Sequence, residues 1–584
     1  MARAESRRGD PLPKAWEAPA AAALLLALAV QLASAVSADG LTSDEVAYIP
    51  AGYRHLTARD YRLNPSQPAL GKMVLAAGLL GLPVQVSAAP SPVDELPWSH
   101  RFVFRDNDPA RLIPRARLPV VLLTCGLAAV VYAWARQASG ARAALIALGM
   151  TAFHPAVLAH GHLATTDMQA ALWMLVASWG CWRWCRAPAS GRAAVVGLAF
   201  GAAVATRLSA WLLLPVLAGL ALARRPRAGA GASARRALVT LFLSLAILPP
   251  AVIWASYGFR RTPWPGAALL PEIKPNLGIP GEVLAAADSA RLFPATYLEG
   301  IRYQIDHSRR GHPAYLLGHW SDLGWPHYYL VAFAVKNTPG FLIAIAAGAV
   351  AAWRSRHHTA DTLHWSAPAV LVFAVASLGA LQLGERYILP MYPYLMMLCA
   401  SALAPLSRTH RGRVLLGLLA VLHAGPALAA ARGGYLAYFN VLARGGEPPL
   451  LDSNLDWGQD LPRLAAWMRL NRVARVQLGY HGADDPGRFG IAHDDLPSQQ
   501  LHPRHSPDGR LSGTVVVSPN LLFGLLPRLR ETYEPLRARP PDARAGVFYV
   551  YFLTGGGGRP RIARDEAARA GTFTPRPRAV PYNW

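Results

Sequence analysis

Long uncharged apolar runs, separated by short polar segments, dominate the first three quarters of the chain. The run 18–38 has only Gln31 and two serines as polar interruptions. About 20 apolar residues, each rising about 1.5 Å along a helix, cross a hydrocarbon layer of about 30 Å. A run of this length predicts a membrane-spanning helix. A signal peptide is the alternative, because basic residues precede the run, but many similar runs follow and this one is longer than the usual core of such a peptide.

Read along its whole length, the pattern predicts a polytopic α-helical membrane protein with about eleven spans. The predicted spans are 18–38, 118–135, 143–159, 168–182, 193–206, 209–222, 237–256, 337–353, 364–383, 387–405 and 414–431. The fifth and sixth are short, as tilted or partly re-entrant helices would be.

The charge pattern indicates the orientation of these spans. Basic residues outnumber acidic ones by 58 to 34. Arginines gather in every second short loop, as with Arg136 and Arg142 or Arg183 and Arg186, whereas the intervening short loops are nearly free of them. This positive-inside distribution predicts a multi-pass protein of the bacterial inner (plasma) membrane with a cytoplasmic N-terminus. It also explains the net charge without a nucleic-acid partner.

Three segments lie outside the predicted spans, and in this topology all of them face outward. They are 39–117, 257–336 and 433–584. The first two are expected to be outer loops of a membrane-embedded domain, 1–432, and the apolar stretch 70–84 is too short to span and is expected at the membrane interface. The tail, 433–584, has three strand-like runs after a helix-like stretch, which predicts a small extracytoplasmic α/β domain.

An acidic pair, Asp44 and Glu45, follows the first span by a few residues. A carboxylate inside hydrocarbon costs roughly 2.5–3.5 kcal/mol, but at the membrane edge this cost largely disappears while lipid headgroups remain in reach. The position suits a base that acts on a lipid-linked substrate. A helix cap or interfacial solvation is the alternative interpretation.

Further along the same loop, Tyr48 and Asn64 precede Lys72, which begins the interfacial stretch. The Lys72 ammonium can meet a phosphate while its stem stays in lipid, although ordinary snorkelling accounts for the position equally well. Farther along the chain, Lys336 and the Arg386–Tyr387 pair recur at the same predicted face. The planar fork of an arginine suits phosphate, and pairing with a local acid is the alternative.

A second acid, Asp167, stands at the outer start of the fourth span, just after His160 and His162. Helix capping is the alternative role. Asp167 and Asp44 share one membrane surface in this topology, so a common site is possible. The two histidines and the carboxylates could hold a divalent metal, but an i,i+2 pair in a loop is a weak signal and no metal ligand is assigned.

At these residues the chain resembles the protein mannosyltransferase and aminoarabinose transferase family (glycosyltransferase family 39) of the C-type superfamily. The resemblance rests on ordered motifs at 44–48, 64–72, 166–167, 315–318, 336–339 and 386–390. Two motifs in the tail, 435–440 and 452–460, are similar to tails of uncharacterised bacterial members of the family.

The resemblance implies a polyprenyl-phosphate sugar donor and transfer with inversion at the outer face. The catalytic acid of the first loop would fall on Asp44 and the second acid on Asp167. Two departures matter. The run Gln67 to Leu70 replaces a common His-Pro-Pro-Leu, which puts donor or acceptor fit in doubt there, and the β-trefoil insert of fungal members has no counterpart, which weakens protein Ser/Thr as the acceptor.

The resulting hypothesis gives Asp44 the acceptor proton and gives Glu45 or Asp167 a supporting role. The expected phosphate-binding residues are Lys72, Arg386 and Lys336, and the expected substrate-binding residues are Tyr48, Asn64, His162 and Tyr387. A transporter or lipid flippase is the rival, although transporters usually carry ionisable residues near the membrane midplane, often in repeated halves. The sugar and the acceptor (protein, lipid or glycan) stay open.

Overall fold

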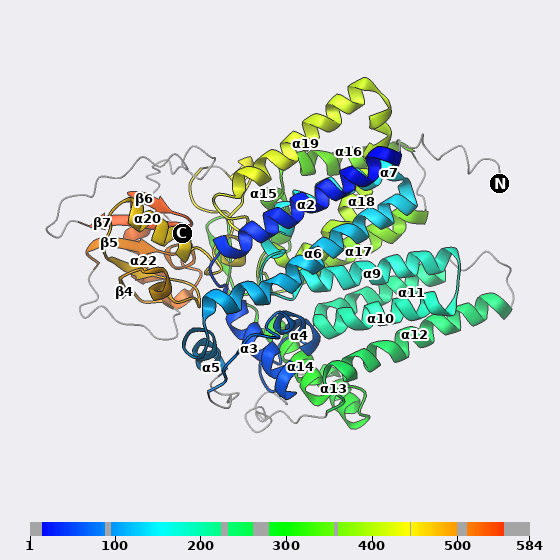
Figure 1. Cartoon of the computed structure of the whole chain (residues 1–584), viewed down its shortest axis with the longest axis horizontal. Helices are drawn as coiled ribbons and strands as arrows, with labels where there is room; N and C mark the ends of the chain where they lie inside the picture. The colour runs from blue at the N-terminus through cyan, green and yellow to red at the C-terminus, as the bar shows by residue number, and fades with distance from the viewer. Residues whose placement is uncertain are drawn as a thin grey trace.

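Long helices form the first part of the chain, and a small mixed sheet lies at one end of the helical bundle (Figure 1). The computed structural model describes residues 14–87, 95–223, 232–260, 279–355, 360–443, 445–498 and 511–553. Parts of the predicted second outer loop and of the predicted tail domain, 261–278 and 554–584, lie outside the described residues.

A helix lies at each of the eleven predicted spans. The helices are α2 (Lys14–Ala38), α6 (Pro109–Ser139), α7 (Ala141–Ala152), α9 (Asp167–Arg186), α10 (Ser190–Thr206), α11 (Leu213–Ala223), α12 (Ala232–Ser256), α16 (Pro339–Ser355), α17 (Ala360–Leu378), α18 (Tyr392–Leu403) and α19 (His410–Ala430). Short helices precede or follow some of them: α8 (Pro155–His160), η2 (Leu208–Leu212), η5 (Glu385–Met391) and η6 (Ala404–Arg408).

The helical membrane character is confirmed, whereas the number of spans stays a prediction. Among the described residues, six helices are long and apolar enough to cross a membrane, and a seventh span results if one bent pair is counted as one. That pair, Tyr328–Lys336 and Pro339–Val350, bends by 116° at its break. Helices α7 and α10 and the stretch Leu208–Ala223 are shorter, so they cross only if the bilayer thins around them or flanking polar side chains extend to its surface.

Helix α10 packs against both α9 and α12, and glycines allow the close approach. A Cβ on Gly197 would lie 2.5 Å from the carbonyl oxygen of Ser244, and one on Gly201 would lie 3.0 Å from Cα of Pro249. Small residues let membrane helices approach backbone to backbone. This packing fixes the C-terminal end of α10 beside the start of α9, where Asp167 lies.

The segment after α2 forms three short helices at the end of the bundle nearest the sheet: α3 (Ser43–Ala58), α4 (Ala69–Ala77) and α5 (Glu95–Arg101) (Figure 1). Helices α3 and α4 touch at Gly52, where a Cβ would lie 2.0 Å from the carbonyl oxygen of Lys72. The second outer segment contains α13 (Ile279–Ser289), α14 (Ala295–Arg310), the hairpin β1 (Ala314–Leu316) and β2 (His319–Ser321), and α15 (Tyr328–Lys336).

The described residues of the C-terminal part form a five-stranded sheet in the order β4-β3-β5-β7-β6. Its elements are α20 (Leu461–Leu470), β3 (Val476–Gly479), β4 (His493–Asp495), β5 (Gly513–Val517), α21 (Pro519–Leu522), α22 (Arg530–Arg537), β6 (Ala543–Ala545) and β7 (Phe548–Leu553). Strand β3 pairs in parallel with β4 and β5, whereas β7 pairs antiparallel with β5 and β6.

Both faces of this sheet are covered, as the alternation of side chains along a strand requires. Val515 and Val517 of β5 pack in a core with Leu536 of α22, whereas Val516 packs in a second core with Leu464 of α20. The mixed α/β character predicted for the tail is thus confirmed. The sequence pattern missed β4 and β6, which have three residues each and include charged side chains.

Candidate active site

Two predicted site residues from distant parts of the chain form an ion pair. Nη1 of Arg386, in η5, donates to Oδ2 of Asp44, in the first turn of α3, over 2.6 Å. The Tyr48 hydroxyl, one helical turn later, donates to the same carboxylate over 3.2 Å. The Asp44 side chain keeps 27% of its surface exposed, against 9% for Arg386. Asp44 is therefore the accessible member of the pair.

A second ion pair lies beside the first. Asp167, the first residue of α9, accepts a hydrogen bond from Arg207, which caps the C-terminal end of α10. The guanidinium groups of Arg207 and Arg386 lie 5.2 Å and 5.8 Å from the ring centroid of Tyr387. The Tyr387 ring thus contacts a cation of each pair. The structure brings together five predicted residues: Asp44, Tyr48, Asp167, Arg386 and Tyr387.

Arg207 is a site residue that the sequence prediction did not include. The sequence did contain an indication of this role, because Arg207 is a lone charge between two short apolar runs at the predicted outer side. What the sequence could not indicate is the packing of α10 on α9, which delivers Arg207 to Asp167.

The site has unused capacity to bind an anion. Nε of Arg386 is buried and has no hydrogen-bond partner among the described residues. Burial, reinforced by the charge of Asp44, raises the pKa of Tyr48 well above its usual range, so the phenol stays a neutral donor. One guanidinium can serve a carboxylate and an incoming phosphate at once, because its donors form a planar fork.

The C-terminal domain also contributes to this site. The Arg386 guanidinium lies over the indole of Trp457, 4.2 Å from the ring centroid, and Trp457 is 6.3 Å from the ring of His160. Trp457 belongs to the acidic run 452–460 of the tail. Its contacts with Arg386 and His160 support docking onto the membrane domain.

Glu45 is enclosed rather than presented to the site. Its carboxylate is fully buried and accepts hydrogen bonds from Arg117 over 2.7 and 2.8 Å, from the N–H of Ala164 over 2.7 Å and from Thr42 over 2.9 and 3.0 Å. Although burial acts to raise the pKa of Glu45, the Arg117 charge and these donors hold it below its usual value. Direct substrate contact therefore does not fit Glu45, which ties α3 to α6 and to the loop before Asp167.

Lys72 and Asn64 form a separate cluster. Nζ of Lys72 donates to the carbonyl oxygens of Asn64 and Leu63, and the Asn64 N–H donates to Glu95 over 3.0 Å. Burial lowers the pKa of Lys72 to about 7 and raises that of Glu95. No ion pair of the described residues joins Lys72 to the two acids of the site. The expected phosphate contact of Lys72 thus has no support in this arrangement.

Lys336 and His162 anchor the C-terminal domain instead of facing the site. Nζ of Lys336 donates to the carbonyl oxygens of Leu436 and Asn454 over 2.8 and 2.7 Å. Nε2 of His162 lies 2.9 Å from Oδ2 of Asp39, whose other oxygen pairs with Arg463 of α20 over 2.7 Å. The sequence prediction placed Lys336 at the phosphate and His162 at the substrate because it could not foresee how the tail docks.

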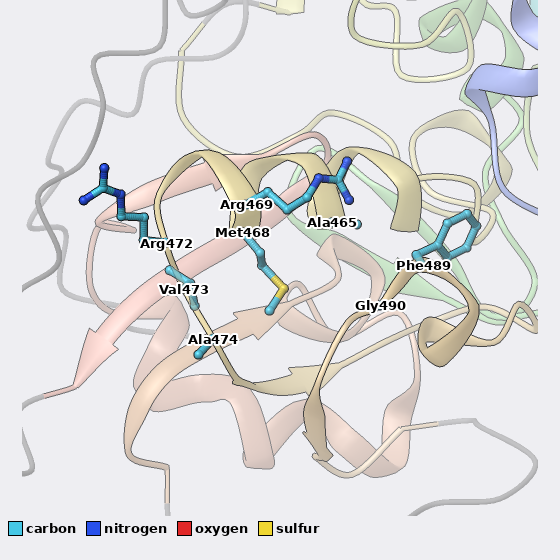
Figure 2. A pocket seen from close by; sticks show the side chains of 8 residues that line it. All are labelled: Ala465, Met468, Arg469, Arg472, Val473, Ala474, Phe489 and Gly490. Atoms are coloured by element: carbon cyan, nitrogen blue, oxygen red, sulfur yellow. The ribbon is translucent and has the colours of Figure 1, made fainter.

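The described part of the chain contains no group of three or more His, Cys, Asp or Glu residues arranged to hold a metal. A surface hollow of about 390 Å³ lies on α20, away from the two ion pairs. Figure 2 shows its lining, which is Ala465, Met468, Arg469, Arg472, Val473, Ala474, Phe489 and Gly490. This lining includes no acid, so the hollow offers no base for a transfer reaction.

Comparison with known proteins decides the class of the chain. Residues 113–254 match the dolichyl-phosphate-mannose-protein mannosyltransferase family. The match confirms the resemblance drawn from the motifs and the predicted class, a membrane glycosyltransferase that takes its sugar from a lipid phosphate. It covers α6 to α12, and so includes Asp167 and Arg207 but neither Asp44 nor Arg386.

Solved structures give distant similarities. ArnT from Cupriavidus metallidurans, in the apo state, is 16% identical over 92% of this chain and 97% of that chain, with a TM-score of 0.45. The same protein bound to undecaprenyl phosphate gives the same identity and score over 98% of its length. The apo oligosaccharyltransferase from Archaeoglobus fulgidus is 12% identical over 78% of this chain and 58% of that chain, with a TM-score of 0.44. No curated protein sequence matches the chain.

Proposed function

We propose that the chain transfers a sugar from a polyprenyl-phosphate carrier to an acceptor hydroxyl at the outer membrane face, with inversion at the anomeric carbon. The observation that carries the proposal is the partly exposed Asp44 carboxylate held 2.6 Å from Arg386, whose Nε remains unpartnered among the described residues. A base and a phosphate-binding cation thus lie side by side.

In this reaction Asp44 accepts the proton of the acceptor hydroxyl. The acceptor oxygen forms a bond to the anomeric carbon as the bond from that carbon to the phosphate oxygen breaks, and polyprenyl phosphate leaves with the bonding electrons. The leaving phosphate is already a stable anion, so the site needs a base more than an acid. A single displacement from the opposite side gives inversion.

Arg386 and Arg207 are the proposed phosphate-binding residues. A cation about 4 Å from a phosphate is worth about 4 kcal/mol at an effective dielectric of 20, enough to change a rate about a thousandfold. Asp167 holds Arg207 in place, and the Tyr387 ring lies against both guanidinium groups. In this arrangement Asp167 is a positioning residue.

Placement at the outer face is supported by the charge pattern. The last turn of α9 carries Arg183 and Arg186, at the opposite end of this helix from Asp167. Arginine-rich loops stay in the cytoplasm, so the ion pairs would face out. A transporter would instead carry its ionisable residues near the membrane midplane, whereas Asp44 lies in the first turn of α3 and Asp167 begins α9.

The test is the release of polyprenyl phosphate by purified protein in lipid nanodiscs, supplied with a panel of labelled polyprenyl-phosphate sugars. Because general-base catalysis contributes about 10² to 10⁴ in rate, Asp44→Asn is expected to slow turnover by at least a hundredfold. Asp60→Asn is the matched control, since Asp60 lies in the same outer segment but pairs with Arg62 and Arg54. Full turnover in Asp44→Asn would remove Asp44 from the base role.

A further inference from the structure

A polar cluster that this mechanism leaves unused lies beside the Asp44–Arg386 pair. It consists of Asp452 and His481 of the C-terminal domain and His312, which precedes β1. Nε2 of His312 lies 3.9 Å from Oδ2 of Asp452. The Asp452 carboxylate is also within electrostatic reach of His481, Arg386 and Asp44. Three segments distant in sequence thus meet at the edge of the proposed active site.

The turn that carries Asp452 is fastened to the Arg386 segment through the side chain of Asn454, and to α15 through the Asn454 carbonyl. Oδ1 of Asn454 accepts the N–H of Glu385 over 2.9 Å, and the carbonyl of Asn454 accepts from Lys336 over 2.7 Å. Gly384, at φ 108°, makes room for this contact, because a Cβ there would lie 2.7 Å from Oγ of Ser453. The position of Asp452 relative to Arg386 is therefore set by the fold.

Asp452 is itself in a conformation that side-chain-bearing residues seldom adopt. Its φ is 59°, in the left-handed region, which aspartate and asparagine tolerate better than most residues. Such strain concentrates at functional sites when the surrounding structure enforces it. Oδ1 accepts the N–H of Ser453 over 2.6 Å, whereas Oδ2 is directed at His312. Nδ1 of His481 is buried without a hydrogen-bond partner among the described residues.

We propose that Asp452, His312 and His481 form an acceptor subsite that binds hydroxyls of a neutral carbohydrate and presents one of them to Asp44. This inference rests on the proposed glycosyl transfer and names its acceptor class.

The chemistry of the three side chains favours hydroxyls over phosphate. Burial lowers the pKa of both His312 and His481, so at neutral pH each imidazole offers one donor and one acceptor. The Asp452 carboxylate adds acceptors. Neighbouring sugar hydroxyls, which donate and accept at once, can use all three groups together. A phosphorylated acceptor would meet the Asp452 charge with no cation among the three, and the single hydroxyl of Ser or Thr would leave most of them unused.

The experiment uses the full-length protein in nanodiscs with the polyprenyl-phosphate sugar that it consumes. Three acceptor probes are compared: a neutral octyl disaccharide, the same disaccharide carrying a phosphate monoester, and a Ser/Thr peptide. We expect the neutral disaccharide to be glycosylated with the lowest KM. Asp452→Asn, which keeps the left-handed turn and the bond to Ser453, should raise that KM at least tenfold while kcat at saturating acceptor falls less than threefold.

His481→Phe is the second variant and should also raise the KM for the disaccharide. Asp494→Asn is the control, because Asp494 is an exposed acid of the same domain, paired with Arg475. An unchanged KM in both variants, an equal loss of kcat and kcat/KM, or a preference of the wild-type protein for the peptide or the phosphorylated probe would overturn the acceptor proposal. Absence of polyprenyl phosphate release in every arm would instead count against the proposed function itself.

Discussion

Asp44 and Glu45 are neighbours in sequence, yet the fold gives them opposite surroundings. Asp44 keeps 27% of its side-chain surface exposed and pairs with a single guanidinium, whereas Glu45 is fully buried among five hydrogen bonds from Arg117, Thr42 and Ala164. Successive residues of a helix point about 100° apart, since each turn has about 3.6 residues. One acid of the pair therefore faces the site and the other holds the site together.

The largest effect expected from this comparison is on stability. Glu45→Gln leaves the Arg117 guanidinium buried without its counter-charge, and breaking such a pair costs about 3–5 kcal/mol. The variant should lose much of its thermal stability in detergent, whereas Asp44→Asn should lose less, because Asp44 is partly exposed and Asp167 also lies within electrostatic reach of Arg386. Thermal unfolding curves of both variants make the comparison. Equal stability of the two would mean that the enclosed pair is not structural.

The next prediction tests the Asp167–Arg207 pair separately from the Asp44–Arg386 pair. Arg207→Met should leave Asp167 buried without its partner and remove one proposed phosphate donor, so turnover is expected to fall about a hundredfold, which corresponds to about 2.7 kcal/mol. Arg207→Lys should restore only part of the loss, because a lysine lacks the planar fork. The measurement is kcat/KM for the lipid-linked donor. Full activity in Arg207→Met would limit phosphate binding to Arg386.

A smaller effect distinguishes the two lysines that the sequence assigned to phosphate. Lys336→Met removes both hydrogen bonds to Leu436 and Asn454, each worth about 0.5–1.5 kcal/mol net, and somewhat more for a charged donor. Hydrogen exchange should become faster in peptides spanning 436–460 while the peptides of α9 stay protected. Lys72→Met serves as the contrast, because among the described residues the Lys72 ammonium bonds only within its own outer segment. Equal exchange in the two variants would refute the anchoring role.

The sequence predicted the elements of the fold better than the contacts between them. Apolar runs sufficed for the helices, since burial in lipid requires length and hydrophobicity alone. They did not distinguish Asp44 from Glu45, because two adjacent acids at one membrane edge look alike until helix α3 is oriented against α6. They also missed Arg207, whose partner Asp167 lies 40 positions away.

The same limit explains why Lys72 and Lys336 make contacts that the sequence did not predict. A lysine beside an apolar run predicts an ammonium at a headgroup, but carbonyl oxygens of a docked segment satisfy it equally well. For Lys336 those carbonyls come from residues 436 and 454, about 100 or more positions further along the chain. Only the docking of the C-terminal domain, which no local pattern specifies, decides between these two roles.

The smallest expected effect is a pH dependence of the local stability of the turn 452–460, which docks on the membrane domain. Burial raises the pKa of Asp456 from its usual value to about 7, and its carboxyl bonds Ser518 and the N–H of Gly458. A raised pKa in the folded state favours the protonated form. The stabilisation is therefore complete below about pH 4, the pKa of an unfolded aspartate, and is lost as the pH rises through about 7.

Hydrogen exchange in peptides spanning 452–460 should become faster over this interval. Asp456→Asn, which mimics the protonated acid, should abolish that dependence, whereas a dependence that persists in the variant would assign it to another group.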